Sequence, residues 1–185
     1  DYQQVDVSDK AAVNGLIAGI KESYGQLNGI IHSAGVIRDG FILRKTKDEL
    51  NEVLKPKVNG VKALDEASKN MELDFLLLFS SISGIYGNIG QADYATANAF
   101  MDEYAHYRNR LVMEGKRQGM TLSINWPLWQ SGGMQVDEVQ QKMMEQALGL
   151  VPLKTELALD GLYRGWSLNN SQLMILEGHI TKLSK

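Results

Sequence analysis

Residues 73–81 read LDFLLLFSS, in which the unbroken apolar run 75–79 closes on two serines. A short run of this kind is typical of a strand that is buried on both faces of a parallel sheet. Similar runs predict strands at residues 27–36, 120–126 and 172–177, and residues 1–7 are predicted to be the end of another strand. The chain is therefore expected to be built around a buried sheet.

Segments with helical spacing lie between these runs. Ser8 is predicted to cap a first helix, which ends at Gly25. The apolar residues of its buried stripe are Val13, Leu16, Ile17, Ile20 and Tyr24. Residues 46–49 form a T-x-x-E capping box at the start of a second helix. Within that helix, Pro56 predicts a break or kink just before Lys57.

Residues 90–116 are predicted to form a long helix. Its expected core residues are Phe100, Tyr104, Tyr107 and Leu111. Since strand and helix alternate along the chain, the sequence predicts an α/β fold, a doubly wound parallel sheet of the Rossmann-like type. The 185 residues suffice for one compact domain, so residues 1–185 are expected to be a single domain. Residues 131–150, SGGM followed by a Met- and Gln-rich amphipathic segment, are predicted to form a lid.

Composition excludes several classes of protein. The 19 basic and 22 acidic residues give a net charge of -3 with no basic stripe, so a nucleic acid partner is not expected. The absence of cysteine rules out a disulfide scaffold, a thiol nucleophile and a thiolate metal site. The three histidines have no ligand-like spacing, so no metal is expected. With no apolar run long enough to span a membrane and no signal pattern, the protein is predicted to be cytoplasmic.

Polar residues that follow the apolar runs indicate where chemistry takes place. In an open parallel sheet, ligands bind at the carboxyl ends of the strands, where Ser81 is expected to lie. Tyr94 and Asn98 are four residues apart on the predicted long helix, so they share one face and can share a pocket. A phenol with an ordinary pKa of about 10 works as a general acid near neutral pH when a cation lowers that value. Lys57 is the candidate cation, and Ser81 the candidate donor to a carbonyl oxygen.

These residues stand in motifs that resemble a known family. FSS at residues 79–81, GQ at 90–91 and YATANAFMD at 94–102 are similar to the FSS…G…GQ…YAAANAFLDAL signature of ketoreductase domains from modular type I polyketide synthases. Those domains belong to the short-chain dehydrogenase/reductase superfamily, whose simple members carry Y-x-x-x-K. Polyketide ketoreductases place asparagine there and bring the lysine from the preceding helix. Asn98 and Lys57, the latter in KPKVNG, match that exchange. The resemblance implies four catalytic residues, Lys57, Ser81, Tyr94 and Asn98.

The resemblance extends over nearly the whole chain and implies a binding site for NADPH. DV at residues 6–7 looks like the family's adenine-contacting pair, HSAG at 32–35 like its floor under the cofactor, and WPLW at 126–129 like its nicotinamide-side WGPW. The implied cofactor-binding residues are Asp6, Val7, Ser33, Ala34, Gly35, Lys57, Tyr94, Pro127 and Leu128. Leu128 departs from the family pattern, because many relatives have a small residue there.

The resemblance also implies residues that control the substrate and its stereochemistry, namely Asp39, Tyr86, Trp129 and Met134. IRD at residues 37–39 is similar to the Leu-Asp-Asp motif of B-type enzymes, although Arg38 interrupts it. The tryptophan typical of A-type enzymes is replaced by Tyr86. The expected product is therefore B-type, with a D-configured β-hydroxyl.

The activity implied is NADPH-dependent reduction of a β-keto group in an acyl chain on the phosphopantetheinyl arm of an acyl carrier protein. The chain contains no G-x-G-x-x-G turn, which such an enzyme needs to hold the pyrophosphate. The resemblance therefore implies that an upstream ketoreductase segment supplies this turn, and that other synthase domains are further partners.

Two other functions stay open. A noncatalytic structural or docking subdomain is disfavoured by the intact set of four residues, and a free-standing short-chain dehydrogenase by the exchange of lysine and asparagine. Taken singly, several residues have structural explanations. Asp6 can cap the first helix together with Ser8, Asp39 can form an Asx turn beside Gly40, and His32 can be a strand-end histidine with satisfied hydrogen bonds.

Overall fold

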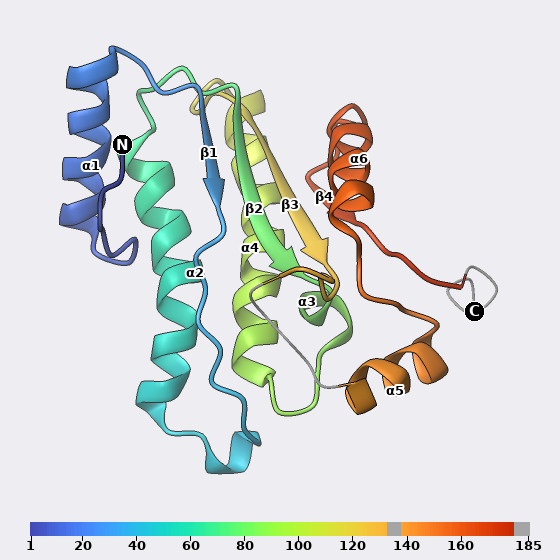
Figure 1. Ribbon diagram of the computed structural model, residues 1–185. Coiled ribbons are helices and arrows are strands. Elements are labelled where there is room, and N and C mark those ends of the chain that lie inside the picture. Colours follow the sequence, from blue (N-terminus) through green and yellow to red (C-terminus); the bar gives the residue numbers. More distant parts are fainter. Residues whose placement is uncertain (133–137, 180–185) are drawn as a thin grey trace.

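A computed structural model gives the fold and describes residues 1–132 and 138–179 (Figure 1). The helices are α1 (Lys10–Tyr24), α2 (Lys47–Ala67), α3 (Ser83–Tyr86), α4 (Ala92–Met113), α5 (Glu138–Leu148) and α6 (Thr155–Trp166), with a 3-10 turn η1 (Ile42–Arg44) before α2. The strands are β1 (Gly29–His32), β2 (Phe75–Ser81), β3 (Met120–Trp126) and β4 (Gln172–Met174).

The four described strands form one parallel sheet in the order β1-β2-β3-β4. Helices α1, α2 and α4 cover one face, and α6 lies over the other (Figure 1). The side chains of successive residues of β2 point alternately to the two faces of the sheet. Leu76 and Leu78 pack with Met101 of α4, whereas Leu77 packs in the cluster that contains Ala158 of α6. The predicted doubly wound α/β fold is confirmed.

One predicted strand is wrong, and others are shorter than predicted. Residues 1–7 form no strand, because this segment turns directly into α1, with the Asp6 carbonyl accepting a hydrogen bond of 3.0 Å from Asp9 N. Val5 and Val7 pack against the core between α1 and α2 instead of pairing along the sheet. Strand β3 has the predicted bounds, whereas β1 keeps only four residues, Gly29–His32, of the predicted range 27–36.

Helix α1 has a capped N-terminus, as predicted, but the capping residue differs from the predicted one. Asp9, not Ser8, is the N-cap, and its side chain accepts hydrogen bonds from two amides of the first turn. The reason is local, since the Ser8 hydroxyl donates to Asp6 Oδ1 at 2.8 Å. Gly25 ends the helix as predicted, with φ of 78°. Tyr24 is 62% exposed and does not belong to the buried stripe.

Helix α2 carries the predicted capping box between Thr46 and Glu49, but it runs through Pro56 without a break. A proline inside a helix costs about 3 kcal/mol, because it removes one backbone hydrogen bond and crowds the preceding turn. Val53 and Val61, three residues before and five residues after the proline, are both fully buried. Packing on both sides therefore holds the helix together across Pro56.

The predicted core stripe of α4 is wrong. Tyr107 is 45% exposed, and Phe100, Tyr104 and Leu111 are only half-buried. The buried face consists of Asp93, Tyr94, Ala97, Asn98, Met101, Asp102, Ala105 and Arg108. Half of these side chains are charged or amide groups, so a search for apolar residues at helical spacing selects the neighbouring face.

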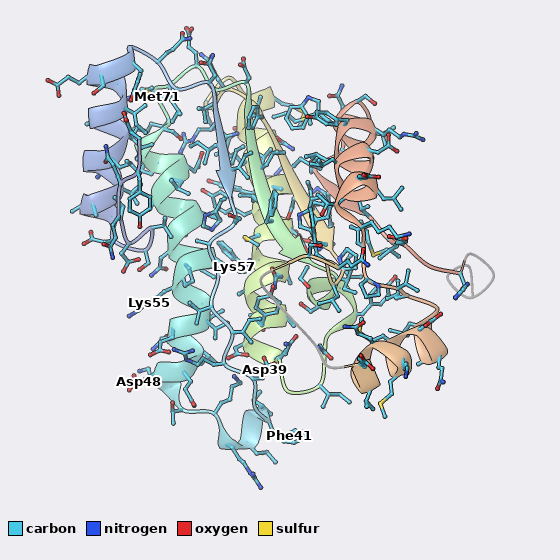
Figure 2. All side chains as sticks on the ribbon, viewed as in Figure 1. Asp39, Phe41, Asp48, Lys55, Lys57 and Met71 are labelled. Atoms are coloured by element: carbon cyan, nitrogen blue, oxygen red, sulfur yellow. The ribbon has the colours of Figure 1, made fainter. Side chains whose placement is uncertain are left out.

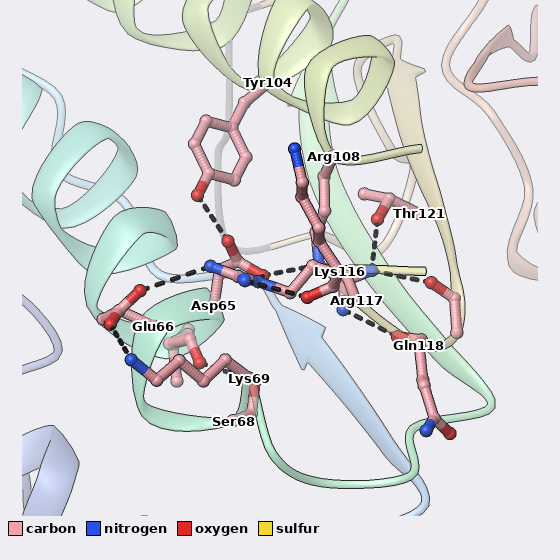
Figure 3. Close-up of polar contacts among 12 residues, drawn as sticks. Asp65, Glu66, Ser68, Lys69, Tyr104, Arg108, Lys116, Arg117, Gln118 and Thr121 are labelled. Atoms are coloured by element: carbon pink, nitrogen blue, oxygen red, sulfur yellow. Dashed lines mark hydrogen bonds and ion pairs between the residues drawn. The ribbon is translucent and has the colours of Figure 1, made fainter. Parts of the chain in front are cut away.

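A buried charge cluster ties α2 and α4 to the segment before β3 (Figure 3). Arg108 Nε lies 2.6 Å from Asp65 Oδ1, and both side chains are almost fully buried. The same guanidinium donates to the carbonyls of Gly119 and Gln118, at 2.6 and 2.8 Å. Tyr104 donates to the other carboxylate oxygen of Asp65 at 2.8 Å. Arg108 thus satisfies several buried acceptors at once.

Replacing Arg108 by methionine is expected to lower the free energy of unfolding by about 3 kcal/mol, because it leaves Asp65 and two carbonyls short of donors. Urea denaturation measures the loss. The control is Arg164→Met, which removes an exposed ion pair with Asp160 and should change stability by less than about 0.5 kcal/mol. Equal losses in the two variants would contradict the structural role of the cluster.

Candidate active site at the carboxyl ends of the strands

The carboxyl ends of β1, β2 and β3 meet at one edge of the sheet. The register pairs Ser81, the last residue of β2, with Trp126, the last residue of β3. Strand β1 stops at His32, opposite Leu78. Strand β2 therefore extends beyond β1 and carries Ser81 into the region where α4 begins. Here the structure brings together the side chains of all four predicted reaction-centre residues.

Lys57 points from the middle of α2 toward this region (Figure 2). Its side chain is buried, and Nζ donates a 2.9 Å hydrogen bond to the carbonyl of Phe79. The same nitrogen lies 5.6 Å from the centroid of the Tyr94 ring. A methyl group at Gly35 would lie 3.1 Å from Lys57 Cε, so a glycine there lets the lysine pass beneath the segment after β1.

Burial lowers the pKa of Lys57 to about 8, opposed by the charge of Asp102. At neutral pH the ammonium form therefore predominates, but the lysine loses its proton at moderately alkaline pH. Burial and the charge of Lys57 lower the pKa of His32 to about 4, so this histidine is neutral. Its Nε2 has no hydrogen-bond partner among the described residues, so the expectation of a satisfied histidine is wrong for this atom.

Tyr94 is 5% exposed, and burial raises its pKa. Hydrogen bonds with the side chains of Asn98 and Ser81 act in the opposite direction, and the charge of Asp39 adds to the increase. The expectation of a lowered pKa is therefore wrong for this structure, because the loss of solvent outweighs the neighbouring donors. The phenol keeps its proton at neutral pH, which is the form that a general acid requires.

Asn98 lies one turn after Tyr94 and is fully buried. Its Nδ2 donates to the carbonyl of Tyr94 at 2.8 Å. Its Oδ1 has no hydrogen-bond partner in the part of the chain that the structure describes. A buried acceptor without a partner is costly, so this oxygen suits an ordered water or a polar group of a ligand.

A second polar cluster lies beneath Ser81. Asp102 of α4 accepts hydrogen bonds from Ser123 Oγ at 2.6 Å and from Asn125 Nδ2 at 2.8 Å. Asn125 Nδ2 also lies within 3.0 Å of the Ser81 carbonyl. These three residues were not predicted from the sequence to belong to the site. Their signal was the spacing of Ser123 and Asn125, two residues apart in an apolar strand, which places both on one face.

The residues predicted to bind cofactor divide into two groups. Ser33, Ala34 and Gly35 follow β1 directly and lie at the same edge as Lys57, with Ser33 and Gly35 exposed. Pro127 and Leu128 follow β3.

Asp6 and Val7, the remaining residues predicted to bind cofactor, make contacts within the chain. Asp6 accepts hydrogen bonds of 2.8 Å from the amide and hydroxyl of Ser8, which lower its pKa, and it does not cap α1. Val7 packs against Gly60 and the core.

The residues predicted to control stereochemistry are placed as follows. Asp39 is exposed, and both of its carboxylate oxygens accept hydrogen bonds from Gln91 Nε2, at 3.0 and 3.1 Å. Tyr86 ends α3 and is 69% exposed. Trp129 packs edge-on against Trp126, with ring centroids 4.9 Å apart. Met134 lies outside the described residues.

Part of the predicted lid, residues 133–137, is also outside the described residues. The remainder contains α5, and a pocket of about 350 Å³ lies between Leu128, Trp129, Gln141 of α5 and the segment that includes Val151 and Pro152. None of the four reaction-centre residues lines this pocket. The lid stays a prediction.

Within the described residues, no group of three or more histidine, aspartate or glutamate side chains is placed to hold a metal ion. The helices of the described chain also include none that is long and apolar enough to cross a membrane.

The parallel sheet, its helices on both faces and the polar cluster at its strand ends define a Rossmann-like α/β protein. The KR domain family model matches residues 1–131, and the chain belongs to this family. It is 50% identical over 184 residues to polyketide synthase PksN of Bacillus subtilis (strain 168), covering 100% of this chain and 3% of the relative. It is 39% identical over 177 residues to polyketide synthase ThaG of Burkholderia thailandensis, and this match covers 96% of this chain and 3% of the relative.

Solved structures agree with this assignment. A ketoreductase domain from the bacillaene assembly line superposes with a TM-score of 0.97 at 50% identity, covering 99% of this chain and 44% of that chain. An N-terminal ketoreductase from the macrolactin assembly line superposes with a TM-score of 0.89 at 41% identity. This match covers 100% of this chain and 35% of that chain. The chain thus spans less than half of these ketoreductase chains. The predicted family is confirmed.

Proposed function

We propose that this chain carries the reaction centre for NADPH-dependent reduction of the β-keto group of an acyl chain held on the phosphopantetheinyl arm of an acyl carrier protein. The observation that carries the proposal is the convergence of Lys57, Ser81, Tyr94 and Asn98 where the strands end. Membership of the KR family supports it, as does the similarity to polyketide synthases and to ketoreductase domains of known structure.

The residues at the strand ends fit the nicotinamide half of the cofactor. Ser33, Ala34 and Gly35 are small residues at the sheet edge directly after β1, and Pro127 and Leu128 directly follow the end of β3. When bound, the reduced nicotinamide supplies a hydride to the carbonyl carbon. The glycine-rich turn that would hold the pyrophosphate is not among the 185 residues. We assign that turn to another segment of the ketoreductase, which is then a partner of this chain.

The chain's own residues act on the carbonyl oxygen. Tyr94 keeps its proton at neutral pH and donates it to the oxygen as negative charge develops there. Ser81 donates a hydrogen bond to the same oxygen and so stabilises that charge. The Lys57 ammonium lies near the phenol ring and stabilises the phenolate that remains after proton transfer. Asn98 Oδ1, which has no hydrogen-bond partner among residues 1–132 and 138–179, offers a site for a water that returns a proton from solvent.

The expected product has a D-configured hydroxyl. Asp39, the mark of B-type enzymes, is held by Gln91 three residues before Tyr94, and Tyr86 stands in place of the A-type tryptophan. Trp129 and Met134 are the predicted contacts on the substrate side.

Steady-state turnover of the full-length protein with a β-ketoacyl thioester tests this function. We expect oxidation of NADPH, a clear preference for NADPH over NADH, and a D-hydroxyacyl product on chiral chromatography. An L-configured product would overturn the B-type assignment alone. Absence of turnover with cofactor bound would favour a noncatalytic subdomain.

A further inference from the structure

A buried ion pair joins the loop after β1 to the start of α4. Lys45 Nζ lies 2.5 Å from Asp93 Oδ2, and the two side chains are only 5% and 1% exposed. The Lys45 ammonium also donates to the carbonyl of Arg38. The second carboxylate oxygen of Asp93 accepts a 2.9 Å hydrogen bond from the amide of Tyr94. One pair of side chains therefore connects the loop to the backbone of the predicted general acid.

The other side-chain contacts of this loop lie at the surface. Gln91 donates to Asp39, and Arg38 Nε lies 2.8 Å from Glu52 Oε2, with both of the latter side chains about half exposed. Exposed ion pairs and hydrogen bonds contribute little net free energy, because water competes for the same groups. A buried pair is different, since removing one partner leaves the other charge without solvent. The Lys45–Asp93 pair is thus the strongest polar restraint on the loop.

The tip of the loop cannot hold its own position by packing. Residues 41–43 are three consecutive apolar residues that are 63% to 95% exposed, and η1 has no buried residue (Figure 2). One backbone hydrogen bond, from Gly40 N to Gly90 O at 2.8 Å, adds to the side-chain contacts. The loop carries Asp39 between these restraints. Its place relative to Tyr94 therefore depends on what ties it to α4.

We infer that the Lys45–Asp93 pair is a positioning device, which fixes the Asp39 loop relative to Tyr94 and so controls how the substrate is oriented. The inference rests on the proposed function for its consequence in catalysis. Neither residue touches the reacting atoms, so the proton donor and its partners stay in place when the pair is lost. Orientation of the acyl chain, and hence its KM and the configuration of the product, should change more than kcat.

The test uses the full-length protein with both charges removed, as Lys45→Met together with Asp93→Asn. Asparagine keeps an acceptor for the Tyr94 amide, and a pair without charge avoids an isolated buried ion. We expect stability close to wild type, whereas Lys45→Met alone is destabilised. In the double variant, the KM for the β-ketoacyl thioester should rise about tenfold and the minor stereoisomer should become measurable, with kcat within about threefold. Lys47→Met, an exposed lysine two residues along the chain, is the matched control.

Hydrogen exchange of residues 38–45 gives a readout that does not need activity. The double variant should exchange there about tenfold faster than wild type, with little change in the amides of α2 after its first turn. Faster exchange in a protein without reductase activity would support the positioning role and reject the proposed function. Unchanged exchange, or unchanged KM and product configuration in a variant with altered exchange, would overturn the inference.

Discussion

Replacing Tyr94 by phenylalanine is expected to lower kcat/KM for reduction of a β-ketoacyl thioester by about 10³-fold, within the range contributed by a positioned general acid. The phenol is buried beside Lys57, Ser81 and Asn98, and its raised pKa keeps the proton available at neutral pH. Phenylalanine keeps the ring and removes the hydroxyl that protonates the new alkoxide in the proposed mechanism. The rate of NADPH oxidation at fixed thioester concentration measures the loss.

Tyr107→Phe is the control for this substitution. Tyr107 lies on the same helix, but it is 45% exposed and on the face away from the site. Its variant should keep wild-type activity, and NADPH should bind to both variants with affinity close to wild type. Similar activity in Tyr94→Phe and wild type would remove the phenol from the mechanism.

Replacing Lys57 by methionine is expected to lower kcat/KM by about 10³-fold and to remove an alkaline limit on the rate. Since burial holds the pKa of Lys57 at about 8, the wild-type rate of reduction should fall as pH rises through that value. Methionine cannot titrate, so the variant should have a low rate that no longer falls there. A pH–rate profile from pH 6 to about 9.5 compares the two proteins.

The same variant should be more stable than wild type at neutral pH. The pKa of Lys57 is lowered from 10.5 to about 8 in the folded protein, so folding disfavours its protonated form. This penalty is complete below pH 8 and disappears as pH rises past 10.5. After the lost hydrogen bond to Phe79 is taken into account, we expect methionine to raise the free energy of unfolding at pH 7 by about 2 kcal/mol.

Urea denaturation beside Lys55→Met tests this expectation. Lys55 is an exposed lysine on the same helix, so its replacement should leave stability unchanged (Figure 2). A loss of stability in Lys57→Met that exceeds the change in Lys55→Met would contradict the buried-charge interpretation. Together with the lost activity, the expected gain would mark Lys57 as a residue kept for function at the expense of stability.

Local pattern was enough to predict the architecture and the strand-end positions of Ser81, Tyr94 and Asn98, but not that of Lys57. The apolar run of β2 identifies a buried strand, and alternation with helices implies a parallel sheet whose carboxyl ends share an edge. Ser81 then lies at that edge because it ends the run, and Tyr94 and Asn98 share a face because they are four residues apart. The position of Lys57 beside Tyr94 could be predicted only from the family resemblance, since nothing in the sequence spacing of the two residues indicates it.

Contacts between distant segments could not be predicted from local pattern. Arg108 and Asp65 are 43 residues apart, and Lys45 and Asp93 are 48 apart, so neither pairing leaves a periodic signal. The buried face of α4 could not be recognised from apolar spacing, because half of its side chains are polar. The pKa of Tyr94 was predicted in the wrong direction, because the degree of burial is a property of the packed site and not of the neighbouring residues in sequence.

Transfer of isotope tests the central claim most directly. The full-length protein is supplied with NADPH deuterated at both C4 positions and with a β-ketoacyl thioester, and the product is analysed by mass spectrometry. Reduction at this site predicts one deuterium on the carbon that bears the new hydroxyl, and about 10³-fold slower labelling with Tyr94→Phe. A product without deuterium at that carbon, or equal labelling by the two proteins, would contradict a carbonyl-reducing centre built on Lys57, Ser81, Tyr94 and Asn98.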